Sequence, residues 1–304
     1  MLIIFIFPLV FAYADLVDHY KPAIGKDGSR SIRNVDFIYI INLDQRPEKY
    51  KSCLEKLAPY NIKPYRFSAV NGWELKLETI NDVGVKLTPE MTKNFLGTVY
   101  LSETQIKPRD AVIGEIGRTY FCHKMPRGSI GIVLSHLSIL HDAFQSGYET
   151  IWVMEDDIEV IRDPRLISDY IEKLDRLVGP DGWDILFTDQ NTKNKDGQYV
   201  HCKSYANRPN FEPKNPNIFT LCKPLGRNFF KIGARYGAYS MIVRRSGMKK
   251  LLDFFDKHKV FLPFDMDFYL PQGIQLFTVS QDIVSTEPRA LSDNGRCGYL
   301  RNKQ

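Results

Sequence analysis

Apolar residues in this chain occur in short continuous runs that alternate with longer stretches of helical spacing. The short runs predict buried strands at residues 35–43, 65–70, 151–155, 183–188, 236–243 and 274–279. The longer stretches predict helices at residues 48–57, 130–144, 166–177 and 247–255. Strands that alternate with helices favour an α/β fold, with a mostly parallel, doubly wound sheet flanked by helices in a single domain.

Local signals predict where two of these helices begin and end. Ser129 is expected to cap the helix that starts at Ile130, and Ser246 the helix that starts at Gly247. Gly147 is expected to end the first of these helices, because glycine readily adopts the left-handed conformation found just past a helix.

The remaining segments indicate how the domain is bounded. Residues 35–290 are expected to form it, preceded by a polar linker at 15–34 and followed by a tail at 291–304. Residues 73–127 have weak periodicity and are interpreted as an inserted excursion. Residues 189–216 are polar and rich in Asn and Lys, which predicts a loop.

The first 14 residues match a short secretory signal peptide. Ala12-Tyr13-Ala14 fits the small-x-small pattern that predicts cleavage before Asp15. No Lys or Arg precedes the apolar run, so a tether on a membrane surface and a misassigned start codon are the alternatives. The segment is too short to cross a bilayer as a helix, which takes about 20 residues. A signal or tether implies export or peripheral membrane association, and without one a cytoplasmic location is expected.

Composition and charge change this picture little. The net charge is +5, with a pI near 8.8 and no dense block of Lys and Arg. Phosphates on a small substrate account for this balance, so nucleic acid is not an expected partner. The five cysteines form no C-x-x-C motif and are interpreted as mainly free thiols. Cys202–Cys222 is the bridge to consider if the protein is exported.

The strand that begins at Ile151 leads directly into three acids, Glu155, Asp156 and Asp157. Because desolvating unpaired charge is unfavourable, the chain is expected to leave the buried sheet at Glu155. This is the carboxyl end of a strand, where open α/β sheets bind their ligands. Adjacent carboxylates with hard oxygen atoms predict a site for Mg²⁺ or Mn²⁺, and with it a diphosphate. A solvated strand end is the alternative.

A second acidic pair, Asp265 and Asp267, follows Pro263. A second metal site, a general base and acceptor contacts are all compatible with it, and so is a helix start stabilised by acids. We expect Asp265 to be the base that takes the proton of an acceptor hydroxyl. Asp184, Asp189 and Asp267 remain alternatives for this role.

The turn after the first strand and one helix carry further polar candidates. In a doubly wound sheet this turn lies beside the nucleotide crevice, where Arg46 is suited to phosphate and Asn42 to a base or ribose. The alternative is a plain turn in which Asp44 caps the next helix. Ser135 and His136 lie within a predicted helix, where His136 is interpreted as a packed residue or as a contact to diphosphate or to the acids.

Several common catalytic motifs are missing from the sequence. It contains no G-x-G-x-x-G, Walker loop, H-E-x-x-H or G-x-S-x-G. This disfavours dehydrogenases, P-loop NTPases, zincins and esterases. A metal-dependent phosphohydrolase built on the same acids and a sugar-binding protein without catalysis remain alternatives to a transferase.

Four motifs occur in an order that resembles glycosyltransferase family 25. They are I-N-L-D-x-R-P-E at 41–48, A-V-N-G at 69–72, G-x-x-L-S-H-L at 131–137 and M-E-D-D-I at 154–158. Gly237-Ala-Tyr239, Ser246-Gly247 and Pro263-x-Asp265 also look like the C-terminal pattern of this family. The family includes lipooligosaccharide and collagen galactosyltransferases.

The resemblance implies a GT-A fold and an inverting transfer that uses a divalent metal, commonly Mn²⁺, and a nucleotide-sugar donor, most often UDP-galactose. The donor-side positions of the family fall on Asn42, Arg46, Ala69, Ser135 and His136. Its D-x-D-like metal position falls on Glu155, Asp156 and Asp157, and its downstream aspartate on Asp265.

The expected reaction moves galactose to a hydroxyl of a glycan, a protein or a lipooligosaccharide, as in lipopolysaccharide biosynthesis. The segments 73–127 and 189–216 are longer than the family pattern implies. Loops of this kind usually form the acceptor side of a cleft, so the identity of the acceptor stays open.

Overall fold

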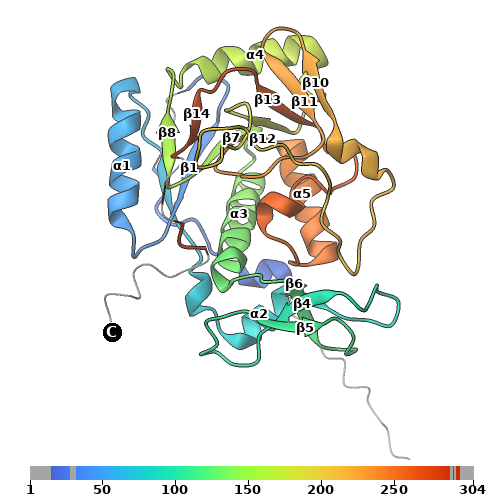
Figure 1. The fold of residues 1–304 in the computed structure, drawn as a ribbon. Coiled ribbons are helices and arrows are strands. Elements are labelled where there is room, and N and C mark those ends of the chain that lie inside the picture. The colour runs from blue at the N-terminus through green and yellow to red at the C-terminus, as the bar shows by residue number, and fades with distance from the viewer. Residues whose placement is uncertain (1–14, 28–31, 288–289, 291, 295–304) are drawn as a thin grey trace, which may run out of the picture.

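The computed structural model describes residues 15–27, 32–287, 290 and 292–294. Its described residues form a central sheet of eight strands with helices on both faces, which confirms the predicted α/β class (Figure 1). In spatial order the strands are β10 (Cys222–Leu225), β11 (Phe229–Ile232), β13 (Leu276–Val279), β9 (Ile185–Phe187), β12 (Ser240–Arg244), β7 (Thr150–Glu155), β1 (Phe37–Asn42) and β2 (Tyr65–Ser68). The predicted signal segment, residues 1–14, lies outside the described residues.

The strand directions make this a mixed sheet. β7, β1 and β2 run parallel to one another, and so do β9 and β13. β12 lies between these two groups and is antiparallel to both neighbours, and β11 is antiparallel to β10 and β13. Hydrophobic patterning predicts that a strand exists but not its direction, so the sequence did not reveal the reversal at β12.

Both faces of the sheet are covered by helices. The helices are α1 (Pro47–Leu57), α2 (Leu77–Val83), α3 (Arg127–Gln145), α4 (Leu166–Val178), α5 (Arg245–His258) and α6 (Phe264–Asp267). Tyr39 and Ile41 of β1 belong to a hydrophobic cluster with residues of α3 and α5. Ile38 and Ile40 point to the opposite face and join residues of α1 and α4. Every residue of β1 is therefore buried, which explains its unbroken apolar run.

The beginning of α3 differs from the prediction, whereas its end agrees with it. Pro126 is the N-cap residue and the helix begins at Arg127, so Ser129 lies inside the first turn instead of capping it. Gly147 follows the C-cap residue with a φ of +74°, the left-handed conformation expected for a glycine that ends a helix. No helix in the described part of the chain is both long enough and apolar enough to cross a lipid bilayer.

The other two predicted caps are also displaced by a residue or two. Arg46 is the N-cap residue of α1, with Pro47 in the first helical position, so Asp44 does not cap this helix. Arg245 begins α5, which places Ser246 inside its first turn. The Ser246 hydroxyl donates a hydrogen bond to the Asp184 carboxylate, at 2.7 Å.

The excursion over residues 73–127 folds into a small unit of its own. Its four short strands pair in the order β3 (Val85–Lys86), β6 (Thr119–Cys122), β4 (Leu96–Val99) and β5 (Arg109–Val112). Together with α2 they lie beside the start of α3, away from the central sheet (Figure 1). Strands of two to four residues are too short to show a clear period, which accounts for the weak sequence signal.

Residues 15–27, which the sequence analysis assigns to a linker at 15–34, pack against the domain. Leu16 is fully buried in the main hydrophobic cluster. Lys21 donates hydrogen bonds from its ammonium group to the Ser68 hydroxyl, at 2.6 Å, and to the Ala69 carbonyl, at 3.2 Å. The segment therefore supports the carboxyl end of β2.

The described cysteines are Cys53, Cys122, Cys202 and Cys222, and all four are free thiols. Cys202 is buried and Cys222 is exposed, so the pair considered for a bridge is not joined. Cys297 lies outside the described residues.

The long loop between β9 and β10 is attached to α6 through a buried ion pair. Arg208 and Asp267 are paired side chain to side chain, and both side chains have no exposed surface. Arg208 also donates to the carbonyls of His258 and Lys259, at 2.6 and 2.7 Å. Asp267 accepts from the backbone N–H of Leu262, at 3.2 Å. This ion pair gives Asp267 a structural role.

Replacing Asp267 with alanine should strongly destabilise the protein, because it leaves the Arg208 charge buried without a counter-charge. The free energy of unfolding measured by urea denaturation should fall by about 3–5 kcal/mol. The control is Asp253→Ala, which breaks the exposed pair of Asp253 with Lys249. That variant should lose less than about 1 kcal/mol. Equal losses in the two variants would contradict the prediction.

Candidate functional site

The carboxyl ends of β7, β1 and β2 lie side by side at one edge of the sheet and border a cleft. Glu155 at the end of β7 is in register with Ile41 of β1, and Asn42 is in register with Ser68 of β2. The cleft is lined by residues from these strand ends, the turn after β2, the helices α1 and α3, and a C-terminal segment: Ile41, Leu43, Lys49, Ala69, Val70, Asn71, Gly72, Trp73, Gly128, Ile132, Ser135, Glu155, Asp156, Asp157, Ser292, Asp293 and Asn294.

The three predicted acids all line this cleft. Glu155 is the last residue of β7, and its side chain is 25% exposed. Asp156 is more enclosed, with 15% of its side chain exposed. In Asp157, the oxygen Oδ1 is buried and has no hydrogen-bond partner. A buried carboxylate oxygen without a partner is unfavourable, so this atom marks a position that a ligand can satisfy.

Burial and mutual repulsion raise the pKa values of all three acids. Burial, followed by the charges of Asp265 and Asp156, raises the pKa of Glu155 to about 8. Burial, followed by Glu155 and Asp156, raises the pKa of Asp157 to about 7. Burial also raises the pKa of Asp156, although Lys49 opposes it. A cation between the carboxylates would relieve this repulsion.

The acids suit a divalent cation that arrives with part of its own ligand shell. Among the residues that the structure describes, no group of three or more His, Cys, Asp and Glu side chains is arranged to hold a metal ion. Mg²⁺ is often bound by only one or two carboxylates and completes its shell with water and substrate phosphates. Asp157 is the best-placed ligand, because its Oδ1 is free of other bonds. The donor set therefore fits a cation that binds together with a diphosphate.

Asn42 positions one of these acids. Its amide nitrogen donates to Asp156 Oδ2, at 2.7 Å, and to the Arg46 carbonyl, at 2.8 Å. Its amide oxygen accepts from Arg66 Nε, at 2.8 Å. Both amide hydrogens are in use, so Asn42 holds Asp156 in position. The contact to a base or ribose that the sequence suggested stays a prediction.

Ser135 and Ala69 shape the wall of the cleft. Ser135 is fully buried; its hydroxyl accepts from the Val70 N–H and donates to the Gly131 carbonyl, both at 2.8 Å. Ala69 is bound through its N–H to the Asn42 carbonyl, at 3.0 Å. The structure thus gives Ser135 a role in fixing the turn after β2, where a donor contact was expected.

Two glycines allow α3 to approach this turn closely. A Cβ atom on Gly131 would lie 2.5 Å from the backbone nitrogen of Gly72. One on Gly72 would lie 1.9 Å from the Arg127 carbonyl oxygen. The glycines of the motifs at 69–72 and 131–137 therefore meet in space, and a side chain on either would separate the turn from the helix.

His136 lies behind the acids, inside the protein. Its ring stacks on Phe264, with centroids 4.1 Å apart, and its Nε2 is 3.3 Å from Glu155 Oε1. Burial lowers the pKa of His136 to about 3, so the ring is neutral. Packing and contact with the acids, two of the roles considered from the sequence, agree with this geometry.

Asp265, the predicted base, belongs to α6 and lies near the acids. Its Oδ2 accepts from the backbone N–H of Gly237, at 3.0 Å. Its charge contributes to the raised pKa of Glu155, so the two groups are close enough to interact electrostatically. Burial raises the pKa of Asp265 itself. The structure therefore brings together two acidic groups that are far apart in the sequence.

The three alternative bases are committed to other contacts. Asp184 precedes β9, at the end of the sheet opposite the cleft, and pairs with Lys250, at 2.7 Å. Asp267 pairs with Arg208, as described above. Asp189 is fully buried and pairs with Arg235, at 2.8 Å. These contacts leave Asp265 as the candidate base.

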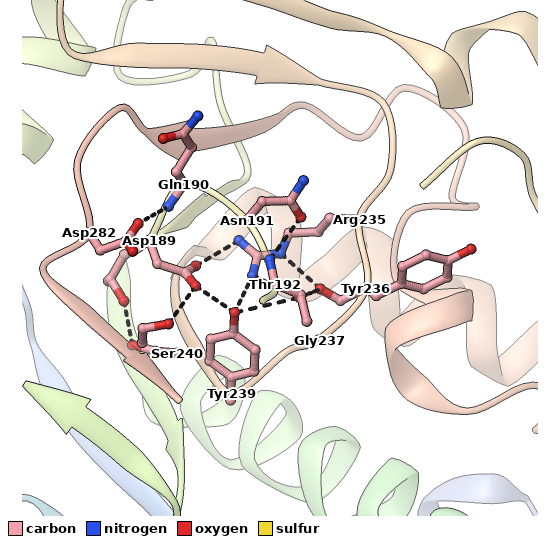
Figure 2. A network of polar contacts seen from close by, with 12 residues as sticks. Asp189, Gln190, Asn191, Thr192, Arg235, Tyr236, Gly237, Tyr239, Ser240 and Asp282 are labelled. Atoms are coloured by element: carbon pink, nitrogen blue, oxygen red, sulfur yellow. Dashed lines mark hydrogen bonds and ion pairs between the residues drawn. The ribbon is translucent and has the colours of Figure 1, made fainter. Parts of the chain in front are cut away.

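Figure 2 shows the network around Asp189. Arg235 donates to one oxygen of Asp189, and the hydroxyls of Tyr239 and Ser285 donate to the other. Arg235 also donates to the Tyr239 hydroxyl, at 2.8 Å. The backbone carbonyl of Tyr239 in turn accepts from the Glu155 N–H, at 2.9 Å. The network therefore supports the backbone that holds the first of the three acids.

Lys49 lines the cleft and was missed in the sequence, whereas Arg46 lies beside the cleft, next to Asp293. Arg46 was predicted, and its Nη1 donates to both oxygens of Asp293, at 2.5 and 2.6 Å. Lys49 lies one turn further along α1, and its Nζ is 3.5 Å from Asp156 Oδ1. A spacing of three residues places side chains on one face of a helix, which would have revealed Lys49. Trp73 also lines the cleft and was missed.

Comparison with known proteins identifies a family. The model of the family described as "Glycosyltransferase family 25 (LPS biosynthesis protein)" matches residues 35–268. The matched region contains the three acids and ends just beyond Asp265. Residues 292–294, which line the same cleft, lie outside it.

Three similar proteins illustrate the range of relatives. A "Glycosyltransferase 25 family member" of Aedes aegypti is 25% identical over 59% of this chain and 24% of its own length. Another from Anopheles gambiae is 23% identical over 72% of this chain and 29% of its own length. The "Inactive glycosyltransferase 25 family member 3" of Homo sapiens is 25% identical over 52% of this chain and 22% of its own length. The chain spans less than a third of the length of these relatives.

Replacing Tyr239 with phenylalanine should weaken the network in Figure 2, because buried Asp189 and Arg235 each lose a partner. The free energy of unfolding in urea should fall by about 1–3 kcal/mol. Tyr199→Phe is the matched control, since its hydroxyl bonds to Asp282 from a partly exposed position. That variant should change stability by less than about 1 kcal/mol. A neutral Tyr239→Phe would show that the network does not stabilise the site.

Proposed function

Since the chain belongs to glycosyltransferase family 25, we propose that it transfers a sugar from a nucleotide-sugar donor to a hydroxyl group of an acceptor. The observation that carries this proposal is the group of three acids at the end of β7, with an unsatisfied oxygen on Asp157. One basic side chain, Lys49, lines the same cleft, and a second, Arg46, contacts Asp293, which also lines it. This combination suits the diphosphate of a donor such as UDP-galactose.

Asp157 would hold a divalent cation, Mn²⁺ or Mg²⁺, with Glu155 or Asp156 as the second carboxylate. When bound, the cation supplies Lewis-acid stabilisation of the negative charge that develops on the departing nucleotide. Asn42 keeps Asp156 in place through its 2.7 Å hydrogen bond. Arg46 and Lys49 would bind the oxygens of the diphosphate, where Arg46 can form two parallel hydrogen bonds.

Asp265 would act as the general base. In an inverting displacement, the acceptor oxygen forms a bond to the anomeric carbon of the sugar while the bond from that carbon to the diphosphate oxygen breaks. The hydroxyl proton passes to the Asp265 carboxylate. Burial raises the pKa of Asp265, which makes it a better proton acceptor than an exposed carboxylate. The N–H of Gly237 holds the carboxylate in position.

A groove beside α6 is the candidate path for the acceptor. It is lined by three segments that are distant in sequence: residues 95–96 and 122–126 of the excursion, residues 206–207 of the long loop, and residues 261–263 and 266 around Asp265. The two segments that are longer than the family pattern implies, 73–127 and 189–216, thus contribute to one surface next to the proposed base. A glycan, lipooligosaccharide or protein hydroxyl is the acceptor class that we propose.

The human relative named as inactive favours one alternative. In that case the chain would bind a nucleotide sugar or a glycan without transferring the sugar. Release of UDP during incubation with a nucleotide sugar distinguishes the two functions, because binding alone releases none.

Asp157→Asn should lose turnover, because it removes a charge from the carboxylate expected to contact the cation. A mass-spectrometric screen of nucleotide sugars with Mn²⁺ should show donor consumption by the unmodified protein. The variant should be slower by at least about a hundredfold. Asp253→Asn, an exposed acid on α5, is the control and should keep full activity. Unchanged turnover in Asp157→Asn would remove the metal assignment.

Asp265→Asn should affect the chemical step and leave donor binding intact. Loss of a general base typically lowers the rate about 10²–10⁴-fold, so kcat should fall by that factor. Calorimetry with UDP and Mn²⁺ should give the same affinity as for the unmodified protein. A kcat within twofold of the unmodified protein would exclude Asp265 as the base.

A further inference from the structure

Asp293, a carboxylate that lines the cleft, lies between Lys49 of the cleft wall and Arg46 beside it. Asp293 accepts two hydrogen bonds from Arg46 Nη1, at 2.5 and 2.6 Å. Lys49 Nζ lies 3.3 Å from Asp293 Oδ2. Only 10% of the Asp293 side chain is exposed. The contact is therefore an enclosed ion pair, which is stronger than the usual surface pair.

The backbone around Asp293 is also held inside the cleft. The indole N–H of Trp73 donates to the Asp293 carbonyl, at 3.1 Å. Asn294 lies so close to Gly128 that a Cβ on this glycine would be 2.5 Å from the Asn294 carbonyl oxygen. Ser292, Asp293 and Asn294 line the same cleft as the three acids. The segment thus occupies space on the donor side of the site.

Asp293 holds this position despite unfavourable charge around it. Its carboxylate contributes to raising the pKa of Asp156, which shows that the two negative groups repel each other. The attraction to Arg46 and Lys49 offsets that repulsion. Here Arg46 Nη1 donates to both carboxylate oxygens. Guanidinium groups bind carboxylates and phosphates alike, so either anion fits between these cations.

We propose that Arg46 and Lys49 form one anion subsite for the donor's diphosphate, and that Asp293 fills this subsite until the donor displaces it. This inference rests on the proposed function. The donor can bind only to molecules in which Asp293 has left the subsite. Its apparent affinity is therefore the intrinsic affinity multiplied by the fraction of molecules in which the subsite is free. Residues 292–294 then act as a built-in competitor of the substrate.

The chain offers a matched control for Asp293. Glu48 also accepts a hydrogen bond from Arg46, at Nε and 2.6 Å, but its side chain is 62% exposed and does not line the cleft. Glu48→Gln and Asp293→Asn each remove one negative partner of Arg46. Only the second removes an anion from the subsite.

Calorimetry on the full chain with pyrophosphate and Mn²⁺ tests the subsite directly. Asp293→Asn should bind pyrophosphate about three- to tenfold more tightly than the unmodified protein. Glu48→Gln should stay within about twofold, because it frees no space in the cleft. Lys49→Met should bind pyrophosphate more weakly than the unmodified protein. Asp293→Asn should raise the affinity for pyrophosphate less in a Lys49→Met protein than in the unmodified protein.

Hydrogen exchange distinguishes displacement of residues 292–294 by the anion from a mere effect of the charge removed in Asp293→Asn. In the unmodified protein, exchange in peptides that contain residues 292–294 should become faster when pyrophosphate and Mn²⁺ bind. Slower exchange would mean that the segment closes over the anion, which overturns the proposal. Affinity that is unchanged or reduced in Asp293→Asn also overturns it.

The outcomes also distinguish this inference from the proposed function. If neither the unmodified protein nor any variant binds pyrophosphate, the assignment of Arg46 and Lys49 as an anion subsite is wrong. If pyrophosphate binds and Asp293 competes with it, the inference stands even when no nucleotide sugar is consumed.

Discussion

Three carboxylates crowded at the end of a buried strand are the constraint around which the rest of the site is arranged. β7 lies inside the sheet, so the chain can expose Glu155, Asp156 and Asp157 only where the strand ends. Like charges at this distance repel, and burial raises their pKa values further. Two of the three have polar partners, since Glu155 lies against His136 and Asp156 accepts from Asn42. Asp157 keeps an oxygen without a hydrogen-bond partner.

Much of the surrounding structure serves to hold this arrangement. Gly72 and Gly131 allow α3 to touch the turn after β2, and Ser135 ties that turn to the helix. On the other side, the buried network of Asp189 and Arg235 supports the backbone next to Glu155. The motifs shared with the family therefore contain residues that shape the cleft as well as residues that line it. This explains why several predicted donor contacts have structural roles.

The sequence allowed the position of the three acids at a strand end to be predicted, because a change from apolar to acidic residues is a local signal. Asp265 was singled out differently, from the acidic pair after Pro263 and from the resemblance to the family. The sequence did not reveal contacts between distant positions. Asp189 lies 46 residues from Arg235, and Asp293 lies 247 residues from Arg46. No local pattern encodes such pairs. The reversed direction of β12 was missed for a related reason, since strand direction depends on the connections of the whole chain.

A crystal structure of the full chain with UDP and Mn²⁺, with the metal located from its anomalous scattering, would show whether the acids bind the donor. We expect a manganese peak in direct contact with the Asp157 carboxylate and the diphosphate, and a diphosphate that also contacts Arg46 and Lys49. UDP bound away from this cleft, or manganese remote from residues 155–157, would contradict this expectation.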